Sequence, residues 1–280
     1  MPQFINKHRA WFIILMSIAA FAAVIFFTAT DNRLKITRYT VRSEEIPRSF
    51  DGATIIQLSD IHGEIPDEAA DFLLENTPTA LVLTGDTIDE RTEDFDNILD
   101  LLSKAAERFP VFLVTGNHEQ WLDDTENLIE RIEKTGARVL GGKTAALALN
   151  GETIYISGIP DPAFMDDKLA ESALMRQNKI TAEKDGFNIL LFHRADMLDC
   201  FDNSGYDLIL SGHLHGGQIR VPLIGGVLSP NGKWLPDYSG GIYELNGGAV
   251  GISNRGLTNS TGLPRIYNRP EAVLITLRRK

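Results

Sequence analysis

Two histidines, two residues apart and set among glycines, follow a short apolar run in the stretch SGHLHGGQI at residues 211–219. Side chains two positions apart in an extended segment point the same way, so His213 and His215 can face one point. Adjacent glycines let the backbone turn sharply and approach another group closely. Taken alone, the pair fits either half of a metal-ligand set or two solvated loop histidines.

The same arrangement recurs at four other places, where polar residues able to bind a metal or move a proton follow an apolar run. These residues are Asp60 and His62 in SDIH, Asp86 and Asp89 in LTGDTID, Asn117 and His118 in TGNHE, and His193 in FHR. Functional groups in open α/β sheets collect at the carboxyl ends of the strands. Five of the six histidines lie at these positions, which favours one shared site over scattered loop residues.

The side-chain types narrow the metal. Imidazole, carboxylate and amide oxygen suit divalent ions such as Mn, Fe or Zn, whereas a single cysteine, Cys200, excludes a thiolate cluster. With Asp89 and His118 left out, seven candidate ligands remain, which are too many for one tetrahedral ion. If they share one bridging carboxylate, they fit two ions about 3.5–4 Å apart, the arrangement that clamps phosphoryl groups.

The five motifs together resemble the motif series of the calcineurin-like metallophosphoesterases, over residues 50–280. The tail NRGLTNSTGLPRIYNRPEAVLITL is similar to the membrane-associated bacterial branch of that family. The resemblance implies an α/β fold, a four-layer α/β/β/α sandwich of two sheets flanked by helices. One departure is visible, because many relatives of this branch place a proline two residues after the ligand histidine, where this chain has Ala195.

Carried over to this chain, the resemblance implies a role for each residue. Asp60, His62 and His215 would bind one metal ion, Asn117, His193 and His213 would bind the second, and Asp86 would bridge them. His118 would be the catalytic general acid beside the leaving group. The implied reaction is hydrolysis of a phosphoester or pyrophosphate bond by metal-activated hydroxide. Its substrate would be a small-molecule or lipid-linked phosphate such as UDP-2,3-diacylglucosamine or a phospholipid.

The alternative function is a non-catalytic metal-binding scaffold on the same fold, which the presence of the whole residue set disfavours. Asp89 is expected to support a turn or a ligand rather than to bind metal. Glu119 is expected either to orient His118 or to act as a carboxylate at a helix N-terminus. Arg194 and Arg255 are expected to pack rather than to contact phosphate. No oligomeric state is indicated.

The N-terminal residues predict a membrane anchor. A basic tail, residues 1–9, precedes an uncharged apolar run at residues 10–30. About 20 apolar residues span a bilayer core, whereas a signal-peptide core is usually about 7–15 residues. We therefore expect an uncleaved single-pass anchor in a bacterial cell membrane, with a cleaved signal peptide as the alternative.

Two features of the sequence make opposite predictions about the side of the membrane on which the catalytic domain lies. The basic residues that follow the run favour a cytoplasmic domain; they are Arg33, Lys35, Arg38 and Arg42. A short basic tail before a single span is typical of a signal anchor, and on that basis we expect an extracytoplasmic catalytic domain.

Residues 31–280 are expected to form one phosphoesterase domain. The chain's net charge of −11 becomes −13 when Lys7 and Arg9 are left out. Nucleic acid is therefore not an expected partner, because phosphate backbones are bound by basic patches. Apolar runs predict strands at residues 54–58, 80–84, 111–115, 153–157, 188–192, 208–210 and 271–277.

Between these strands, mixed polar and apolar stretches predict helices at residues 66–76, 92–109 and 125–134, the last with Thr125 as its N-cap. Strands that alternate with helices indicate an α/β fold. Residues 219–262, rich in glycine and proline, are expected to be either a β-rich closing segment or a mobile loop.

Overall fold

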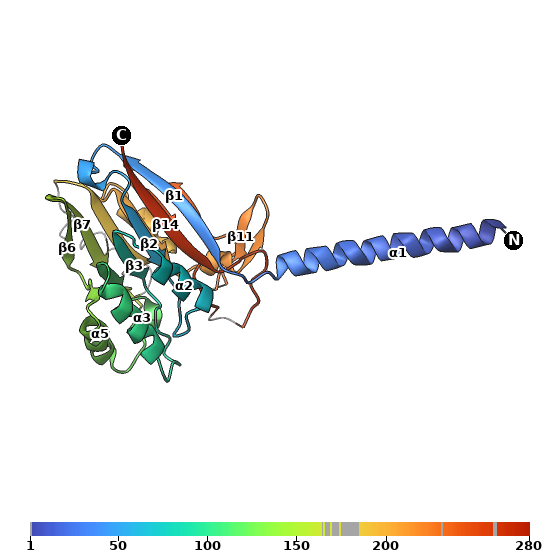
Figure 1. Ribbon diagram of the computed structural model, residues 1–280, viewed down its shortest axis with the longest axis horizontal. Helices are drawn as coiled ribbons and strands as arrows, with labels where there is room; N and C mark the ends of the chain where they lie inside the picture. Colours follow the sequence, from blue (N-terminus) through green and yellow to red (C-terminus); the bar gives the residue numbers. More distant parts are fainter. Residues whose placement is uncertain are drawn as a thin grey trace.

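The computed structural model describes residues 2–163, 165, 169, 174, 185–230, 232–259 and 262–280. Two β-sheets with flanking helices form the body, and one long helix, α1 (Pro2–Ala29), leads away from it (Figure 1). Among the described residues, His8–Ala29 is the one segment long and apolar enough to cross a membrane; a signal sequence passes the same test. At a rise of about 1.5 Å per residue, a helix of this length matches the roughly 30 Å hydrocarbon core.

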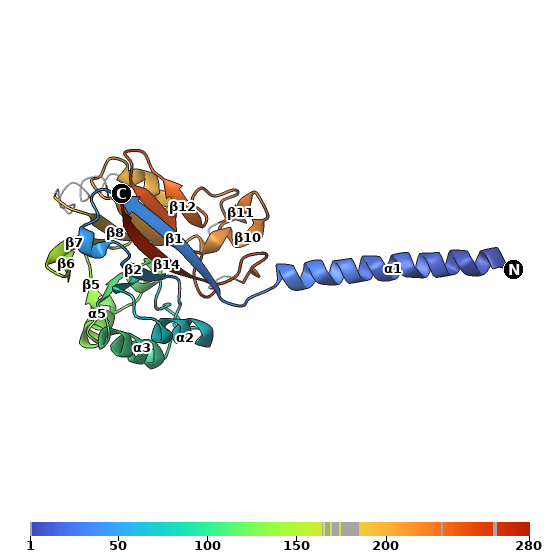
Figure 2. The same cartoon turned by 45° about the horizontal axis from the view of Figure 1, so that its top comes forward.

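The first sheet has the strand order β1-β14-β2-β3-β4-β5. Its strands are β1 (Lys35–Ser43), β14 (Glu271–Arg279), β2 (Thr54–Leu58), β3 (Ala80–Thr84), β4 (Val111–Val114) and β5 (Arg138–Val139). Neighbours pair in parallel except β14 and β2, which are antiparallel. Its outer face is covered by α2 (Asp67–Glu75), α3 (Asp96–Ala106) and α5 (Thr125–Lys134) (Figure 2).

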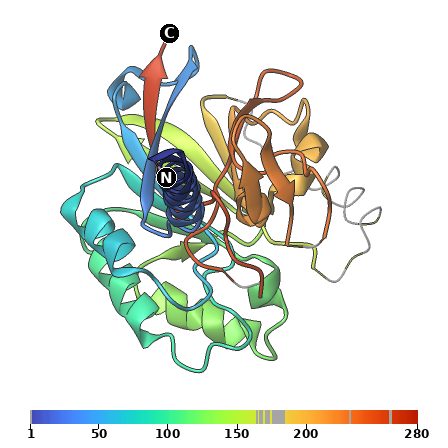
Figure 3. The ribbon, with the colours of Figure 1, turned by 90° about the vertical axis from the view of Figure 1, so that its right-hand side faces the viewer.

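The second sheet has the strand order β12-β13-β9-β8-β7-β6. Its strands are β12 (Gly241–Glu244), β13 (Val250–Ser253), β9 (Leu208–Gly212), β8 (Asn188–Arg194), β7 (Glu152–Ile159) and β6 (Thr144–Leu149). The four inner strands are parallel, and the two edge strands are antiparallel to their neighbours. A short antiparallel pair, β10 (Ile219–Val221) and β11 (Gly225–Leu228), stands apart and lies beside α1 when the helix is seen end-on (Figure 3).

The two sheets pack face to face around one apolar core. Val82 and Phe112 from the first sheet belong to the same buried cluster as Ile156, Leu191 and Leu210 from the second. Strands such as β3 are buried on both faces, which explains why they read as continuous apolar runs rather than alternating ones.

Three layers of the expected four-layer sandwich are therefore described. On the outer face of the second sheet, the described residues place the 3₁₀ segment η2 (Ala195–Phe201), whose Leu198 and Phe201 pack in a third apolar cluster. Much of the chain between β7 and β8 lies outside the described residues.

The predicted elements agree with the structure in type, and most bounds differ by a few residues. β2, β3 and α5 have the predicted bounds, whereas β1, β5 and β6 were not predicted. The β-rich alternative is correct for residues 219–262, which contain β10 to β13. The predicted N-cap of α5 is wrong: the side chain of Asp124 accepts the backbone N–H of Asn127, at 3.0 Å, and Thr125 is the first helical residue.

Candidate metal centre and active site

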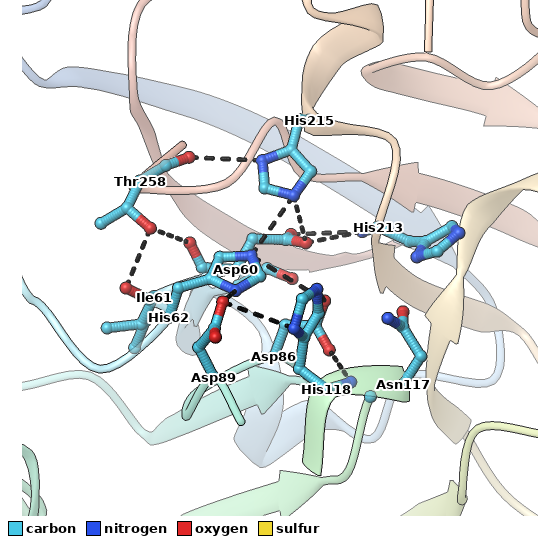
Figure 4. A network of polar contacts seen from close by, with 12 residues as sticks. Asp60, Ile61, His62, Asp86, Asp89, Asn117, His118, His213, His215 and Thr258 are labelled. Atoms are coloured by element: carbon cyan, nitrogen blue, oxygen red, sulfur yellow. Dashed lines mark hydrogen bonds and ion pairs between the residues drawn. The ribbon is translucent and has the colours of Figure 1, made fainter. Parts of the chain in front are cut away.

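The seven predicted ligands and His118 come from both sheets and meet where the carboxyl ends of their strands face each other. Asp60 follows β2, Asp86 follows β3, and Asn117 begins the short helix α4 (Asn117–Gln120) after β4. From the second sheet, His193 lies near the end of β8, His213 follows β9, and His215 begins the 3₁₀ turn η3 (His215–Gly217). Figure 4 shows Asp60, His62, Asp86, His118 and His215 pointing towards a common centre.

One group of donors converges on His193. Its Nε2 atom lies 3.1 Å from Asp86 Oδ2, 3.2 Å from Asn117 Oδ1 and 3.2 Å from Nδ1 of His213. Its other ring nitrogen, Nδ1, lies 2.8 Å from the carbonyl oxygen of Thr84. When Nδ1–H donates to that carbonyl, Nε2 carries a free lone pair, which is how outer partners orient metal-binding histidines.

A second group contains Asp60, His62 and His215. His215 Nε2 lies 3.4 Å from Asp60 Oδ1 and 3.3 Å from Nε2 of His62. The remote nitrogens face acceptors, since His215 Nδ1 is 3.3 Å from the Thr258 carbonyl and His62 Nδ1 is 3.3 Å from Asp89 Oδ2. Two imidazole nitrogens facing each other at this distance repel unless a proton or a cation lies between them. This donor set fits a divalent cation.

Asp86 lies between the two groups. Its Oδ2 atom is 3.1 Å from Nε2 of His193 in one group and 3.9 Å from Nε2 of His62 in the other. Its Oδ1 atom accepts the backbone N–H of His118 at 3.0 Å. Burial would raise the pKa of this carboxyl, but the charge and hydrogen bond of His193 hold it well below its usual value. Asp86 is therefore the carboxylate placed to serve both groups.

The pKa values of the surrounding histidines are shifted in opposite directions. Burial lowers the pKa of His193, but the charge and hydrogen bond of Asp86 raise it well above its ordinary value. Burial, together with the charge of His193, lowers the pKa of His213 to about 3. Burial and the neighbouring Arg265 also lower the pKa of His215 well below its ordinary value. Neutral imidazole is the form that binds metal, so His213 and His215 are ready as ligands.

The backbone at these residues is unusual. Asp60, His62, Asp86, His213 and His215 all have positive φ angles, between 45° and 74°. Such conformations are uncommon outside glycine, although Asp and His tolerate them better than most residues, and they cluster at functional sites. Side chains that follow one another along an extended strand point to alternate faces of the sheet. The positive φ angles interrupt this alternation, so that these side chains can point into the site.

Glycines surround the buried carboxylates. A Cβ on Gly116 would lie 2.6 Å from the backbone nitrogen of Asp86 and nearer still to Oδ1. A Cβ on Gly256 would lie 2.7 Å from the Cβ of Asp60. These close approaches require glycine. The first brings together the loops after β3 and β4 of the first sheet, and the second packs the loop after β13 of the second sheet against Asp60.

His118 is held outside the two groups. Its Nδ1 contacts Oε2 of Glu90 and lies 3.4 Å from Oδ2 of Asp89, while its Nε2 lies 3.9 Å from Oδ2 of Asp86. The ring packs edge-on against Trp121, and its side chain is 13% exposed. Two carboxylates thus orient His118. Asp89, His62 and His118 form a further cluster that could hold a cation, so the supporting role of Asp89 stays a prediction. Glu90 was missed because a charged residue after a turn carries no sequence signal.

Glu119 does not contact His118 through its side chain, so the first of its two predicted roles is wrong. Its buried carboxylate accepts backbone N–H groups from Gly116, at 2.8 Å, and from Asp86 and Ile88, each at 3.0 Å. The bond to Gly116 caps α4, as the second role requires. The other bonds hold the loop that carries Asp86. Burial, and then the charge of Asp86, raise the pKa of Glu119 to about 7.

Among the arginines, Arg255 pairs with Glu271 at 2.7 Å inside the fold, in agreement with a packing role. Arg194 lies 3.4 Å from Asp196. Arg265 was missed by the sequence reasoning, because it lies 50 residues after His215 in the chain; its Nη2 is 3.3 Å from Nδ1 of His215, and another of its N–H groups donates to the carbonyl of Arg255.

Comparison with known proteins identifies the family of this chain. The family description "Calcineurin-like phosphoesterase" matches residues 53–217. The chain is 31% identical over 256 residues to the uncharacterized metallophosphoesterase YkuE of Bacillus subtilis, covering 88% of this chain and 86% of that protein. It is 27% identical to the phosphodiesterase YaeI of Escherichia coli, with coverage of 80% and 81%. A "transmembrane protein with metallophosphoesterase domain" from Danio rerio is 25% identical, with coverage of 95% and 62%.

The chain therefore belongs to the calcineurin-like phosphoesterases, a family of metal-dependent hydrolases of phosphoester bonds.

Proposed function

We propose that this protein is a membrane-anchored phosphoesterase with two divalent ions, Mn, Fe or Zn, that cleaves a lipid-linked phosphodiester or pyrophosphate. The observation that carries the proposal is the position of Asp86, whose Oδ2 lies between a histidine of one donor group and a histidine of the other. In one group the remote nitrogen of His193 faces the carbonyl of Thr84, and in the other the remote nitrogen of His62 faces Asp89. The carboxylates of Asp60 and Asp86 are both buried. This is the arrangement expected of a two-metal site.

In this proposal Asp60, His62 and His215 hold one ion, Asn117, His193 and His213 hold the other, and Asp86 serves both. The bound ions supply positive charge for the phosphoryl oxygens and lower the pKa of the attacking water. His118 then acts as the general acid. Its Nδ1 faces the carboxylates of Glu90 and Asp89, which fix the orientation of the ring, and its Nε2 is left to give a proton to the leaving oxygen.

The membrane part of the proposal is supported by α1. Its segment His8–Ala29 has the length and composition of a span, and the Danio rerio relative is named as a transmembrane protein. We place the anchor in a bacterial cell membrane, uncleaved, with the catalytic domain of residues 31–280 outside the cytoplasm. A site tethered at a bilayer meets lipid-linked phosphates at high local concentration, which favours these substrates, UDP-2,3-diacylglucosamine and phospholipids among them, over protein phosphates or nucleic acid.

The proposal is tested on the full chain in detergent micelles. Bound metal is measured together with hydrolysis of a nitrophenyl phosphomonoester, a nitrophenyl phosphodiester and a lipid-linked pyrophosphate. Asp86→Asn is expected to lose at least one ion and nearly all hydrolysis, because one uncharged amide replaces the carboxylate that serves both groups. Asp100→Asn, on the exposed face of α3, changes the same chemical group and should behave as the parent protein.

Two outcomes would contradict the proposal. Two ions bound without hydrolysis of any substrate would favour the scaffold function, and full hydrolysis by Asp86→Asn would remove the two-metal assignment.

A further inference from the structure

The hairpin formed by β10 and β11, with the loop that follows it, carries an exposed apolar surface. Leu223 at its tip is fully exposed, and Ile224, Trp234 and Leu235 are 67%, 70% and 60% exposed. We call these four side chains the hairpin patch. Tyr243, Tyr267 and Ser239 line a neighbouring hollow of about 1030 Å³. Large apolar side chains gathered in this way on a soluble surface mark an interaction site.

The hairpin patch is fixed relative to the base of α1 by backbone hydrogen bonds. The N–H of Tyr267 donates to the carbonyl of Ala29, the last residue of α1, at 2.7 Å. The neighbouring carbonyl of Ile266 accepts the N–H of Arg220 in β10, at 2.9 Å. A short chain of bonds therefore joins the helix end to the hairpin.

The views of the whole molecule agree with this connection. β11 lies on the side of the body from which α1 leaves, close to the base of the helix (Figures 1 and 2). When the helix is seen end-on, the segment around residues 220–240 lies beside it (Figure 3). A bilayer crossed by α1 would therefore have its surface next to the hairpin patch.

The charge of this region differs from that of the rest of the chain. Residues 208–236 and 245–270 contain no Asp or Glu, and Asp237 and Glu244 lie between them, although the chain has 38 such residues among 280. Lys233 lies in the hairpin region, 3.7 Å from Asp237, and Arg33, which pairs with Asp31, and Lys35 follow α1. This face carries fewer carboxylates than the rest of this acidic protein, so anionic headgroups repel it less. Trp234 is also of the residue type that settles at the membrane–water interface.

We propose that the hairpin patch rests in the headgroup layer of the anionic bilayer that α1 spans, as a second membrane contact. This inference rests on the anchor assigned in the proposed function. The contact would give the catalytic domain a second point of attachment to the bilayer, beside the base of α1. The occupant of the patch is the lipid surface itself.

The test uses tryptophan fluorescence of the full chain in vesicles of phosphatidylglycerol and phosphatidylcholine. The chain has three tryptophans, Trp11 in α1, Trp121 and Trp234, so that paired Trp→Phe substitutions leave either Trp11 or Trp234 as the only emitter. Lipids brominated near the carbonyl or at mid-chain quench tryptophan according to depth. We expect bromine near the carbonyl to quench Trp234 more than mid-chain bromine does, and we expect brominated lipid to quench Trp11, which lies within the span His8–Ala29.

A matched pair of double variants tests the patch. Leu223→Asp with Ile224→Asp should abolish most quenching of Trp234, because two carboxylates enter an anionic surface. Ala146→Asp with Ala148→Asp adds the same charge on the exposed face of the distant edge strand β6 and should leave quenching unchanged. Neither pair touches the metal centre, so hydrolysis of soluble nitrophenyl phosphodiester should remain as in the parent.

The outcomes separate the inference from the proposed function. Quenching of Trp11 without quenching of Trp234 would overturn the inference and leave the anchor intact. Absence of quenching at Trp11 would overturn the anchor and, with it, the membrane contact. The proposed phosphoester hydrolysis would still be tested by the soluble nitrophenyl phosphodiester. Protection of Trp234 that persists in detergent, together with a dimeric mass, would overturn the inference in favour of a second copy of the chain.

Discussion

Gly116 offers the sharpest test of how the metal centre is built. It is the N-cap of α4, with φ at −96°, a conformation that alanine adopts without backbone strain. A methyl group there would lie 2.6 Å from the backbone nitrogen of Asp86 and 2.9 Å from Cδ2 of His193, whereas ordinary contacts begin at 3.4 Å. Gly116→Ala therefore perturbs the site by volume alone.

The expected magnitude follows from this geometry. Restoring ordinary contact displaces the Asp86 loop or the His193 ring by about 1 Å, a shift that typically costs on the order of 10²-fold in rate. Overpacking of this kind also destabilises a fold by about 1–3 kcal/mol. Calorimetric metal titration measures the change in metal affinity, hydrolysis of nitrophenyl phosphodiester measures the change in rate, and urea unfolding measures the change in stability.

The matched control is Gly141→Ala, because a Cβ on Gly141 meets nothing within 4 Å. It should keep the metal affinity, the rate and the stability of the parent. The reasoning is refuted if Gly116→Ala binds both ions with unchanged affinity and hydrolyses substrate at the parental rate.

Two further predictions concern single side chains. His118→Ala should keep both ions but lose about 10²–10⁴-fold in rate on an alkyl phosphodiester and less on a nitrophenyl ester, which needs little proton donation; metal loss would contradict the acid role. Asp161 lies buried two residues after β7, and neither of its carboxylate oxygens has a hydrogen-bond partner among the described residues. In chelated protein, burial raises the pKa of Asp161 to about 6, above its unfolded value of 3.8, so its contribution to stability is present below pH 4 and is lost as pH rises through 6. Asp161→Asn should therefore gain up to about 3 kcal/mol over the parent in urea unfolding between pH 4 and pH 8, and parallel curves would refute this.

The location of the site was predictable because it depends on a rule about sheets. Short apolar runs gave β2 and β3 with the correct bounds, and the polar residues after them had to meet at the carboxyl ends of neighbouring strands. The family resemblance then added roles that the geometry accommodates. The roles themselves remain predictions until metals and rates are measured.

Other features were not predictable, for physical reasons that differ from case to case. β1 is mostly polar, its exposed and half-buried positions do not strictly alternate, and its partner strand lies more than 200 residues away, so its local signal is weak. The contact of Glu90 with His118 and the close approach of Gly116 to Asp86 arise only when segments from separate strands pack together. Asp124 displaced Thr125 as N-cap because both residue types cap helices well and adjacent candidates compete.

The pairing of β1 with β14 has a consequence for biosynthesis. Lys35 to Ser43 align with Glu271 to Arg279, and β14 also separates β1 from β2. During translation β1 emerges early, directly after α1, and must wait for its partner until more than 200 further residues have been made. A message interrupted before residue 271 would thus yield a product with open edges on both β1 and β2. Unpaired strand edges recruit other chains, so such truncated products are expected to aggregate and to depend on proteases for removal.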